Sequence, residues 1–441
     1  MLPRSTRRSR SSKKINRDLL IVAFSTRGLA DLTCGSAFRS ITAVDAFGDR
    51  DNPSHVENVS TRRDLGMPFT NEAIIKACEG RAEGGVLVYG GGMENRPELV
   101  ETLARGRLLA GNSALVLQKA RDPECLSSLC LEESIPFPET LYPGEEERSE
   151  GDIYCPGDGS CWLRKRVLSG GGAGVSEYRG GRLESGEILQ RHLPGRPVSV
   201  SFIAFEDGVL ILGFTEQLTG ISFLGASGFK WSGNITPLPG GQEGVLRFYA
   251  KAASYAEIIS DRLGLRGFNG IDMILGPDGS VSVIEVNPRY SGSMELFGSG
   301  GYGGEMFSLH LAAFQGGKLR GNKPESSGGK SFRAKGIVYA VRDCQAPDTL
   351  NWMEAGRRDV PWTGDVFSPG DPVCTIFSSS PEEEECIRGL ADEADRVYAE
   401  LVVPCEGGDQ GNGCKEESHE MCSHNRADPG TDERHAPRKD W

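Results

Sequence analysis

The chain has 441 residues, of which 59 are glycine, and a formal net charge of −13. A chain of this length can bury two or three substantial cores, and its many glycines favour tight turns and loops over a helical bundle. No apolar run reaches the roughly 18–20 residues that span a bilayer, and the negative net charge argues against a nucleic-acid partner. We therefore expect a protein of several domains with no membrane or nucleic-acid partner.

The first 17 residues differ in composition from the rest of the chain. They hold seven Lys or Arg residues and no acidic residue, so the remaining chain carries a net charge of −20. This composition predicts a disordered basic tail over residues 1–17, with a transit peptide as the alternative. No secretory signal is visible and the twelve cysteines form no tight framework, so we expect reduced thiols in a cytoplasmic protein.

Residues 18–115 alternate short apolar runs with helical patterns, which predicts a doubly wound parallel sheet. The expected strands are 18–24, 41–45 and 85–89. A small-residue helix is expected up to about Ser40, and a second helix near residues 71–80. Such sheets bind ligands at the carboxyl ends of their strands. In this chain those ends are residues 25–28, 45–51 and 90–95.

A glycine-rich stretch, residues 169–175, follows an expected strand at 161–168 that carries Lys165. Glycines let backbone N–H groups approach phosphate oxygens, and the lysine ammonium adds a point charge, so the two features together predict an ATP phosphate site. The glycines are Gly170, Gly171, Gly172 and Gly174. A flexible surface turn is the alternative for this segment considered alone. The glycines at 90–92 lack the spacing of a dinucleotide fingerprint, which argues against a nicotinamide-dependent dehydrogenase.

The other segments are assigned from periodicity and composition. Helices are expected at 118–130, 245–263 and 305–316. Residues 143–160 are expected to form a mobile surface loop, 321–330 a linker, 331–402 a small β-rich unit that ends in a helix, and 403–441 a disordered tail. In that tail, His419, Cys422 and His424 match no usual zinc-binding spacing.

Two apolar runs, residues 271–275 and 281–286, flank a short polar turn. The turn contains Asp278 and Gly279, which tolerate the positive φ that a tight hairpin requires. The pattern therefore predicts an antiparallel hairpin with Asp278-Gly279 as its two-residue loop.

In that register Asp272 lies opposite Glu285 on one face of the hairpin, and Asn287 shares this face two residues further on. Two carboxylates and an amide oxygen form a hard-oxygen site that suits Mg²⁺ or Mn²⁺, because such ions take a few carboxylates together with water and phosphate oxygens. Arg289, just beyond the strand, adds a planar donor that can grip a phosphate. A surface hairpin with scattered polar side chains is the alternative, and the neighbouring Ile, Val and Met residues disfavour it.

The pattern Gly-x-Asp…Asp-Gly…Ile-Glu-Val-Asn-Pro-Arg over residues 270–289 resembles the metal-binding end of the ATP-grasp superfamily. The resemblance covers roughly residues 18–402. It is nearest to carboligase-like proteins related to biotin carboxylase and carbamoyl-phosphate synthase. It implies an α/β fold of the ATP-grasp type, in which Asp272, Glu285 and Asn287 hold Mg²⁺ between the ATP phosphates. Arg289 and Lys165 would then be the catalytic residues.

The resemblance also implies a domain organisation. Residues 18–115 would form a Rossmann-like domain that precedes the ATP site and helps to hold the second substrate. Residues 116–320 would form a two-lobed ATP-grasp domain with a glycine-rich lid over about 160–213. Residues 331–402 resemble the small C-terminal part of carboxylase-like members.

Further site residues follow from the same resemblance. Residues 188–202 resemble the segment whose backbone borders the adenine, which makes Gln190 and Leu193 the expected adenine-edge residues and Ser199 a possible ribose contact. An ordinary strand–loop–strand is the alternative. The strand end at 214–220 is a candidate wall for the second substrate, although satisfied polar groups at a strand end fit it as well.

Superfamily chemistry implies that a carboxylate or bicarbonate is activated as an acyl phosphate and captured by a nucleophile, usually an amine. Biotin carboxylase follows the arginine with a Gln-x-Glu pair used on bicarbonate, whereas this chain has Ser291 and Ser293. We therefore expect a ligase that takes small-molecule carboxylate and amine substrates and releases ADP and phosphate. A carboxylase acting on bicarbonate and a non-catalytic ATP-binding regulatory protein are the alternatives. Glu295 is a possible substrate contact, with a helix-start acid as the alternative.

Overall fold

The computed structural model describes residues 17–145, 161–239, 242–298, 303–319 and 331–403. The expected basic tail, the surface loop before Cys161, the linker at 321–330 and the polar C-terminal tail fall wholly or almost wholly outside these residues. Among the helices that the described residues form, none is both long enough and apolar enough to cross a membrane.

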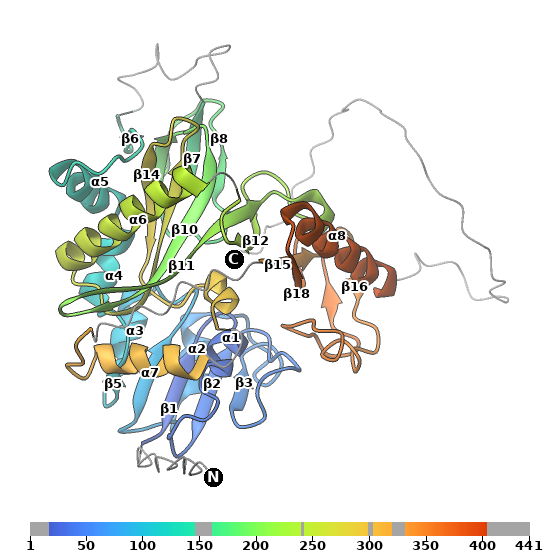
Figure 1. The fold of residues 1–441 in the computed structure, drawn as a ribbon. Helices are drawn as coiled ribbons and strands as arrows, with labels where there is room; N and C mark the ends of the chain where they lie inside the picture. Colours follow the sequence, from blue (N-terminus) through green and yellow to red (C-terminus); the bar gives the residue numbers. More distant parts are fainter. Residues whose placement is uncertain (1–16, 146–160, 240–241, 299–302, 320–330, 404–441) are drawn as a thin grey trace, which may run out of the picture.

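The N-terminal part forms a five-stranded parallel sheet with the strand order β3-β2-β1-β4-β5, shown in blue in Figure 1. Its strands are β1 Leu19–Val22, β2 Ile41–Asp45, β3 Glu57–Ser60, β4 Val86–Tyr89 and β5 Leu108–Leu109. Its helices are α1 Arg27–Asp31, α2 Asn71–Cys78 and α3 Pro97–Ala104. Every residue of β1, β2 and β4 is buried, as is usual for a parallel sheet covered on both faces.

Several details of this part differ from the sequence prediction, which included neither helix α3 nor the strands β3 and β5. The helix α1 ends at Asp31 rather than near Ser40, because the Thr33 hydroxyl donates to the Ala30 carbonyl at 2.6 Å and Gly35 adopts a φ of +75°. Gly35 ends the turn at residues 32–35 that follows the helix, and it prevents the helix from resuming. The strand β3 was not predicted, since its sequence Glu-Asn-Val-Ser is too short and polar to show a strand period.

The expected helix at 118–130 is two helices, α4 Ala114–Arg121 and α5 Pro123–Glu132. The break lies at Asp122, whose side chain caps α5 by accepting from the Glu124 N–H at 2.9 Å. Pro123 then occupies the first turn of α5, where its missing N–H costs nothing. The Asp-Pro pair is therefore a helix-start signal within an otherwise helical pattern.

A seven-stranded antiparallel sheet lies above the parallel sheet in the order β14-β13-β10-β11-β12-β15-β18 (green to orange in Figure 1). Its strands are β10 Arg196–Phe205, β11 Gly208–Thr219, β12 Trp231–Thr236, β13 Gly267–Leu275, β14 Val281–Asn287, β15 Phe332–Tyr339 and β18 Pro372–Ser380. The helix α6 Gln242–Leu263 packs on the sheet through Phe248, Ala252 and Ile259. A short helix, η2 Ser222–Leu224, follows β11.

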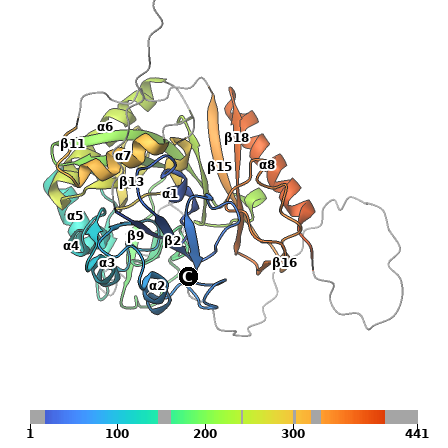
Figure 2. The ribbon, with the colours of Figure 1, turned by 90° about the horizontal axis from the view of Figure 1, so that it is seen from below.

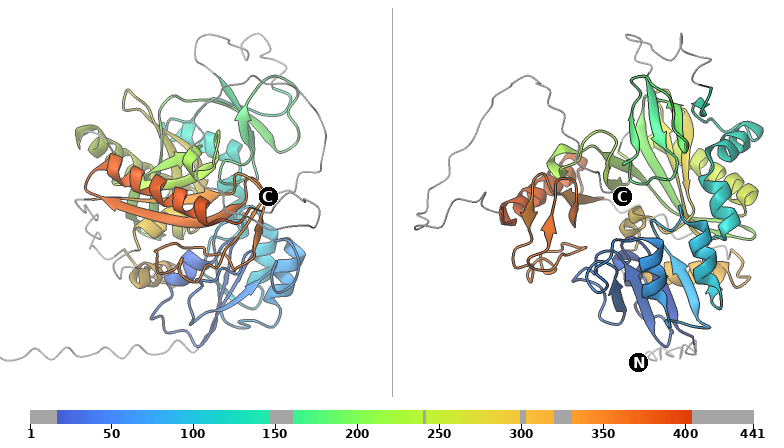
Figure 3. Two further views of the ribbon diagram at one scale, coloured as in Figure 1. Left: turned by 90° about the vertical axis from the view of Figure 1, so that its right-hand side faces the viewer. Right: turned by 180° about the vertical axis from the view of Figure 1, so that it is seen from behind.

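A smaller four-stranded antiparallel sheet carries the lysine and the glycine-rich stretch. Its order is β6-β9-β7-β8, and its strands are β6 Thr140–Leu141, β7 Trp162–Arg166, β8 Val175–Glu177 and β9 Glu187–Arg191. We call this unit the lid sheet. In the view from behind (Figure 3, right), it stands above the parallel sheet beside the larger antiparallel sheet.

The C-terminal part extends the large sheet. β15 pairs with β12 and β18 pairs with β15, so the last strands of the chain continue the sheet that holds the hairpin. The helix α8 Glu383–Glu400 runs along β15 and β18 (Figure 2) and buries Leu390 and Val397 against them. A separate two-stranded ribbon pairs β16 Cys344–Gln345 with β17 Val366–Phe367.

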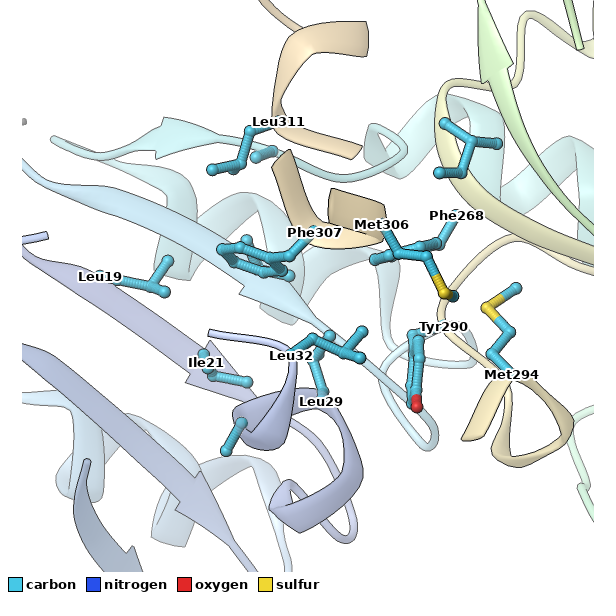
Figure 4. Close-up of a cluster of buried hydrophobic side chains, with 14 of the residues drawn as sticks. Leu19, Ile21, Leu29, Leu32, Phe268, Tyr290, Met294, Met306, Phe307 and Leu311 are labelled. Atoms are coloured by element: carbon cyan, nitrogen blue, oxygen red, sulfur yellow. The ribbon is translucent and has the colours of Figure 1, made fainter. Parts of the chain in front are cut away.

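One hydrophobic core joins the parallel sheet to the large antiparallel sheet. Figure 4 shows Leu19 and Ile21 of β1 facing Phe307 and Leu311 of α7 Gly303–Ala313, with Phe268 of β13 behind. Because these elements share a core, the two sheets have a fixed relation, and loops from both can form one site.

Candidate active site

The turn of the β13–β14 hairpin is one residue longer than the sequence predicted. The Gly276 N–H donates to the Ser280 carbonyl at 2.9 Å and the Gly279 N–H to the Gly276 carbonyl at 3.0 Å. Three residues, 277–279, therefore form the loop, and Gly279 takes a φ of +78°. A three-residue hairpin with a left-handed third residue is a common alternative to the Asp-Gly two-residue turn.

A β-bulge corrects the register that this longer loop would otherwise shift. Met273 pairs with Val283, and then Asp272 pairs with Glu285, so Ile284 is the additional residue. Without the bulge Glu285 would point to the opposite face, because each shift of one residue reverses the faces of a strand. The predicted pairing of Asp272 with Glu285 thus exists, but it depends on a bulge that the sequence reasoning did not include.

The three expected metal ligands lie together at the hairpin. The Asn287 side-chain amide donates to Asp272 Oδ2 at 2.9 Å, and the Ser199 hydroxyl on β10 donates to Asp272 Oδ1 at 2.6 Å. Burial, and then the negative charge of Glu285, raise the pKa of Asp272. Two partly buried carboxylates that face each other in this way favour a nearby positive charge.

Glu285 obtains such a charge from Arg121, the last residue of α4. The Arg121 guanidinium donates to Glu285 Oε1 in a close ion pair. Burial alone would raise the pKa of Glu285, but the charges of Arg121 and Lys165 hold this pKa below its ordinary value. Arg121 was not predicted as a site residue, because it falls inside the expected helix at 118–130, where nothing distinguishes it from a surface arginine.

Lys165 lies on β7 of the lid sheet and points into the same region. Its ammonium donates to Gln190 Oε1 on β9 at 2.8 Å, and the Gln190 amide donates onward to Thr140 Oγ1 at 3.2 Å. Burial lowers the pKa of Lys165, although Glu285 and Asp272 oppose this effect. The contact joins the expected phosphate lysine to an expected adenine-edge residue.

The glycine-rich loop that follows β7 lies close to the start of β12. The Trp231 N–H donates to the Gly171 carbonyl at 2.9 Å. Gly172 has a φ of +75°, and a Cβ at this position would lie 1.9 Å from the Phe229 carbonyl oxygen. Glycine is therefore required at residue 172 both by its backbone conformation and by the close approach of a second backbone.

Arg289 is oriented by its neighbours on both sides. Its Nε donates to Glu94 Oε1 at 2.7 Å, in the loop after β4, and one terminal nitrogen donates to Asn287 Oδ1 at 3.1 Å. Glu94 is only 3% exposed. The sequence analysis named the loop at 90–95 as a ligand-binding strand end but did not connect Glu94 to Arg289.

A cavity of about 420 Å³ brings these side chains together, a volume within the usual range for small-molecule sites. Most of the site residues expected from the sequence line it: Lys165, Gly170, Gly171, Gly172, Gln190, Leu193, Asp272, Glu285, Asn287 and Arg289. Ser199, Gln217, Ser291 and Ser293 line it as well. Gly174 belongs to the same loop, but it packs against Ser169 and Arg166.

Two acidic residues in the segments considered for substrate contacts form ion pairs within the protein. Glu216 pairs with Arg196, whose Nε donates to it at 3.0 Å. Glu295 forms ion pairs with Lys335 and, at 2.5 Å, with Arg27. These contacts fix the strand end at 214–220 and the segment that follows Ser293.

The carboxyl end of β1, an expected ligand-binding end, is also filled by the protein. The Arg27 guanidinium is 3% exposed and donates twice to the Asp359 carboxylate, both times at 3.1 Å. Asp51, at the end of β2, accepts from the Val360 N–H at 2.8 Å. The C-terminal part therefore packs against the carboxyl ends of β1 and β2 in the parallel sheet.

The donor set at the hairpin fits a hard divalent cation that shares its ligands with a phosphate group. The described residues contain no cluster of three or more His, Cys, Asp or Glu side chains around a metal-sized site. Asp272 and Glu285 supply two carboxylates, and Asn287 supplies an amide oxygen. A cation here would take its remaining ligands from water or phosphate, as Mg²⁺ commonly does.

A comparison with known protein families matches the part of the chain that contains most of this site. Residues 126–293 match the ATP-grasp domain family. No curated protein matches the sequence of the chain. Among solved structures, carboxyaminoimidazole ribonucleotide synthase of Aspergillus clavatus, complexed with ATP, is similar with a TM-score of 0.59 and 15% identity, over 87% of this chain and 99% of that one.

Two further solved structures share the fold. L-amino acid ligase of Bacillus licheniformis has a TM-score of 0.59 and 15% identity, over 89% of this chain and 99% of that one. The biotin carboxylase domain of 2-oxoglutarate carboxylase from Hydrogenobacter thermophilus, solved with MgADP and bicarbonate, has a TM-score of 0.63 and 14% identity, over 88% of this chain and 90% of that one. At these identities the likeness concerns the fold alone.

Proposed function

Because this chain contains an ATP-grasp domain, we propose that it is an ATP- and Mg²⁺-dependent ligase that joins a carboxylate to an amine. The γ-phosphoryl group of ATP passes to a carboxylate oxygen, which yields an acyl phosphate and ADP. The amine then attacks the acyl carbon, and phosphate leaves. The observation that carries this proposal is the convergence of Asp272, Glu285 and Asn287 with Lys165 and Arg289 in one cavity.

The hairpin residues would hold the cation. Asp272, Glu285 and Asn287 offer oxygen ligands on one face, and the raised pKa of Asp272 reflects how strongly this pair of carboxylates needs a positive charge. Mg²⁺ bound there would neutralise the charge of the ATP phosphate oxygens. One of the similar solved structures contains ATP and another contains MgADP, which supports ATP and Mg²⁺ as the ligands of this site.

Lys165, Arg289 and the glycine-rich loop would position the phosphates. Lys165 is already directed into the cavity by Gln190, and Arg289 is held by Glu94 and Asn287. Backbone N–H groups at Gly170–Gly172 can approach phosphate oxygens without Cβ contacts. Phosphoryl transfer needs little covalent help from the protein, so such positioning and electrostatic stabilisation would supply most of the catalysis.

Gln190 and Leu193 would border the adenine. Both line the cavity, and Gln190 is buried between Lys165 and Thr140. A side-chain amide can both donate and accept, which suits the hydrogen-bonding edge of a base. In this arrangement the base would lie beside Gln190 and Leu193, and the phosphates would lie between Lys165 and the hairpin.

The serines beyond Arg289 favour an amine ligase over a carboxylase. Ser291, Ser293 and Ser201 form a chain of hydroxyls, with Oγ–Oγ distances of 2.9 Å and 3.2 Å. Deprotonating bicarbonate requires a general base, and a hydroxyl without a base beside it is a much poorer one than a carboxylate near neutral pH. These serines are suited instead to accept and donate hydrogen bonds to an uncharged part of a substrate.

The test is the release of ADP and phosphate by the purified protein with ATP and Mg²⁺. A panel of amino acids and other small carboxylates is supplied with and without amine acceptors, and bicarbonate forms a separate arm. A ligase should release ADP substantially only when both an acid and an amine are present. ADP release that needs bicarbonate and no other acid would support the carboxylase. Tight ATP binding with no ADP release in any arm would support a regulatory protein.

A further inference from the structure

Arg121 contacts three parts of the molecule that meet at the cavity. The residue is 9% exposed at the end of α4. Its Nη1 pairs with the Glu285 carboxylate of the hairpin, and its Nε donates to Asn95 Oδ1 at 3.0 Å, in the loop after β4. Its Nη2 donates to the carbonyls of Val167 and Ser169 at 3.2 Å and 2.9 Å. These two carbonyls open the glycine-rich loop.

Among these contacts only the one to Glu285 joins two full charges. A guanidinium presents five N–H donors in a fixed plane, so the same group can pair with a carboxylate and hold neutral carbonyls at once. A hydrogen bond from a guanidinium to a neutral carbonyl is weaker than one in which the acceptor also carries a full charge. The position of the Arg121 guanidinium, and with it the hold on Val167 and Ser169, therefore depends on Glu285.

Glu285 is also one of the oxygen ligands that the proposed function assigns to Mg²⁺. A carboxylate that turns toward a divalent cation gives up much of its attraction for a monovalent partner, because the divalent charge is larger and more compact. The other two cations near Glu285 are directed elsewhere: the Lys165 ammonium donates to Gln190 at 2.8 Å, and the Arg289 guanidinium donates to Glu94 and Asn287. Arg121 is thus the cation that Mg²⁺ would displace from Glu285.

We propose that Arg121 is a positioning residue that stands in for the divalent cation at Glu285 and links the metal site to the glycine-rich loop. When Glu285 turns to the cation, Arg121 loses its charged partner and its hold on Val167 and Ser169 weakens. The loop is then free to adjust around the phosphates that the cation brings. This inference rests on the proposed function only for the identity of the cation.

Coupling of this kind is reciprocal. If the cation weakens the hold of Arg121 on Glu285, then the guanidinium in turn weakens cation binding, so a change that removes the competing charge should strengthen cation binding. Couplings between sites are typically about 5- to 150-fold in affinity. Removing the charge of Arg121 should therefore tighten binding of a divalent cation at least about fivefold.

The experiment uses the full chain with Mn²⁺ alone as the probe, without nucleotide. Mn²⁺ affinity is measured by electron paramagnetic resonance, and amide hydrogen exchange is followed over residues 167–175 by mass spectrometry. The variants are Arg121→Met, which removes the charge, and Arg121→Lys, which keeps the charge but not the planar fork. Lys119→Met is the matched control, since it removes an exposed positive charge from the same helix.

In the wild type and in Lys119→Met, Mn²⁺ should accelerate exchange in this loop several-fold. Arg121→Met should bind Mn²⁺ at least about fivefold more tightly and exchange rapidly in the loop with or without the metal. Arg121→Lys should bind Mn²⁺ like the wild type, within about twofold, while its loop already exchanges rapidly in the absence of the metal. This separation keeps the test decisive even if Arg121→Met does not fold.

Two results would overturn the inference while leaving the proposed ligase intact. One is Mn²⁺ binding to the wild type with no change in loop exchange, and the other is Arg121→Lys with the loop protection of the wild type. Failure of Mn²⁺ to bind either the wild type or the Arg121 variants would overturn the inference together with the cation site of the proposed function. The two failures are therefore distinguishable.

Discussion

At the scale of single residues, the site is assembled from positions that are close and far in sequence, and only the close ones could be predicted. Asp272 and Glu285 lie in one hairpin, so period-two reasoning placed them opposite each other despite the missed bulge. Arg121 and Glu94 reach the hairpin across 164 and 195 residues. Contacts at that separation leave no local pattern, so neither residue was named as part of the site.

The charge of Glu285 is expected to be essential for turnover. Glu285→Gln keeps the shape of the side chain but removes one of the two carboxylates that would bind the cation, so kcat/KM for MgATP should fall at least about 100-fold. Steady-state ADP release measures this, with thermal unfolding as the check on folding. Glu257→Gln removes a charge from the exposed face of α6 and should leave turnover unchanged. Equal turnover in Glu285→Gln and the control would remove the hairpin from the mechanism.

At the scale of elements, local sequence patterns were sufficient to predict where the buried strands lie, but not which strands pair with each other. The apolar runs of β1, β2 and β4 are recognisable because both faces of a parallel strand are buried. The assignment of 331–402 as a small β-rich unit left open where its strands would go. In the structure β15 pairs with β12, almost 100 residues earlier in the chain, and no periodicity encodes such a partner.

The glycine-rich loop offers a test of whether its packing against the start of β12 matters. Gly172→Ala would place a methyl group 1.9 Å from the Phe229 carbonyl oxygen, so the loop must move. Gly171 also has a positive φ, of +60°, but a Cβ there meets nothing within 4 Å. Both alanines incur the left-handed cost of about 1–2 kcal/mol. KM for ATP should therefore rise several-fold more in Gly172→Ala than in Gly171→Ala, and equal effects would exclude a role for the packing.

At the scale of the whole molecule, buried charges join the parallel sheet to the rest of the chain. Arg27 of α1 meets Asp359 of the C-terminal part and Glu295, three residues beyond Gly292. Glu295 also pairs with Lys335 of β15, and the charges of Arg27 and Lys335 hold its pKa below the ordinary value despite burial. Glu295 is therefore not free for the substrate contact considered for it from the sequence, because Arg27 and Lys335 both lie against it.

Removing Arg27 should destabilise the protein strongly. Arg27→Met removes a buried guanidinium and leaves the Asp359 carboxylate, which is 25% exposed, without its main cationic partner. Breaking an ion pair of this kind should cost up to about 3–5 kcal/mol. Urea unfolding of Arg27→Met measures this loss. The double variant Arg27→Met/Asp359→Asn should recover part of the stability, because it removes the carboxylate that is left unpaired. If the double variant is no more stable than Arg27→Met, then the unpaired Asp359 carboxylate is not the cause of the lost stability.

His310 should make stability depend on pH at the junction of the two sheets. Its Nδ1 accepts from the Phe268 N–H at 3.0 Å, its Nε2 lies 3.1 Å from the Ala110 carbonyl, and burial lowers its pKa from 6.5 to about 4. The unfolded chain therefore binds a proton between pH 6.5 and 4 that the folded protein does not. Stability is complete above pH 6.5 and falls as the pH decreases through this window, by at most about 1.4 kcal/mol per pH unit.

The comparison that isolates this effect is urea unfolding of the wild type and His310→Asn at several pH values. Buried carboxylates such as Asp51 titrate in the same range, but they are present in both proteins and cancel in the difference. The stability difference between the two proteins should change between pH 7 and pH 4.5 in the direction that disfavours the wild type at low pH. A difference that does not change with pH would contradict the assignment.

The pairing of β12 with β15 has a consequence for how the protein is made. The large sheet is completed only when β18 has left the ribosome, 144 residues after the end of β12. At about 5–20 residues per second this interval lasts roughly 7–30 s. During that time the sheet has an unpaired edge, first that of β12 and then that of β15, and Arg27 still lacks its partners Glu295 and Asp359 until they are synthesised. An unpaired strand edge is a site for association with other chains, so we expect the nascent protein to depend on chaperones most strongly in this interval.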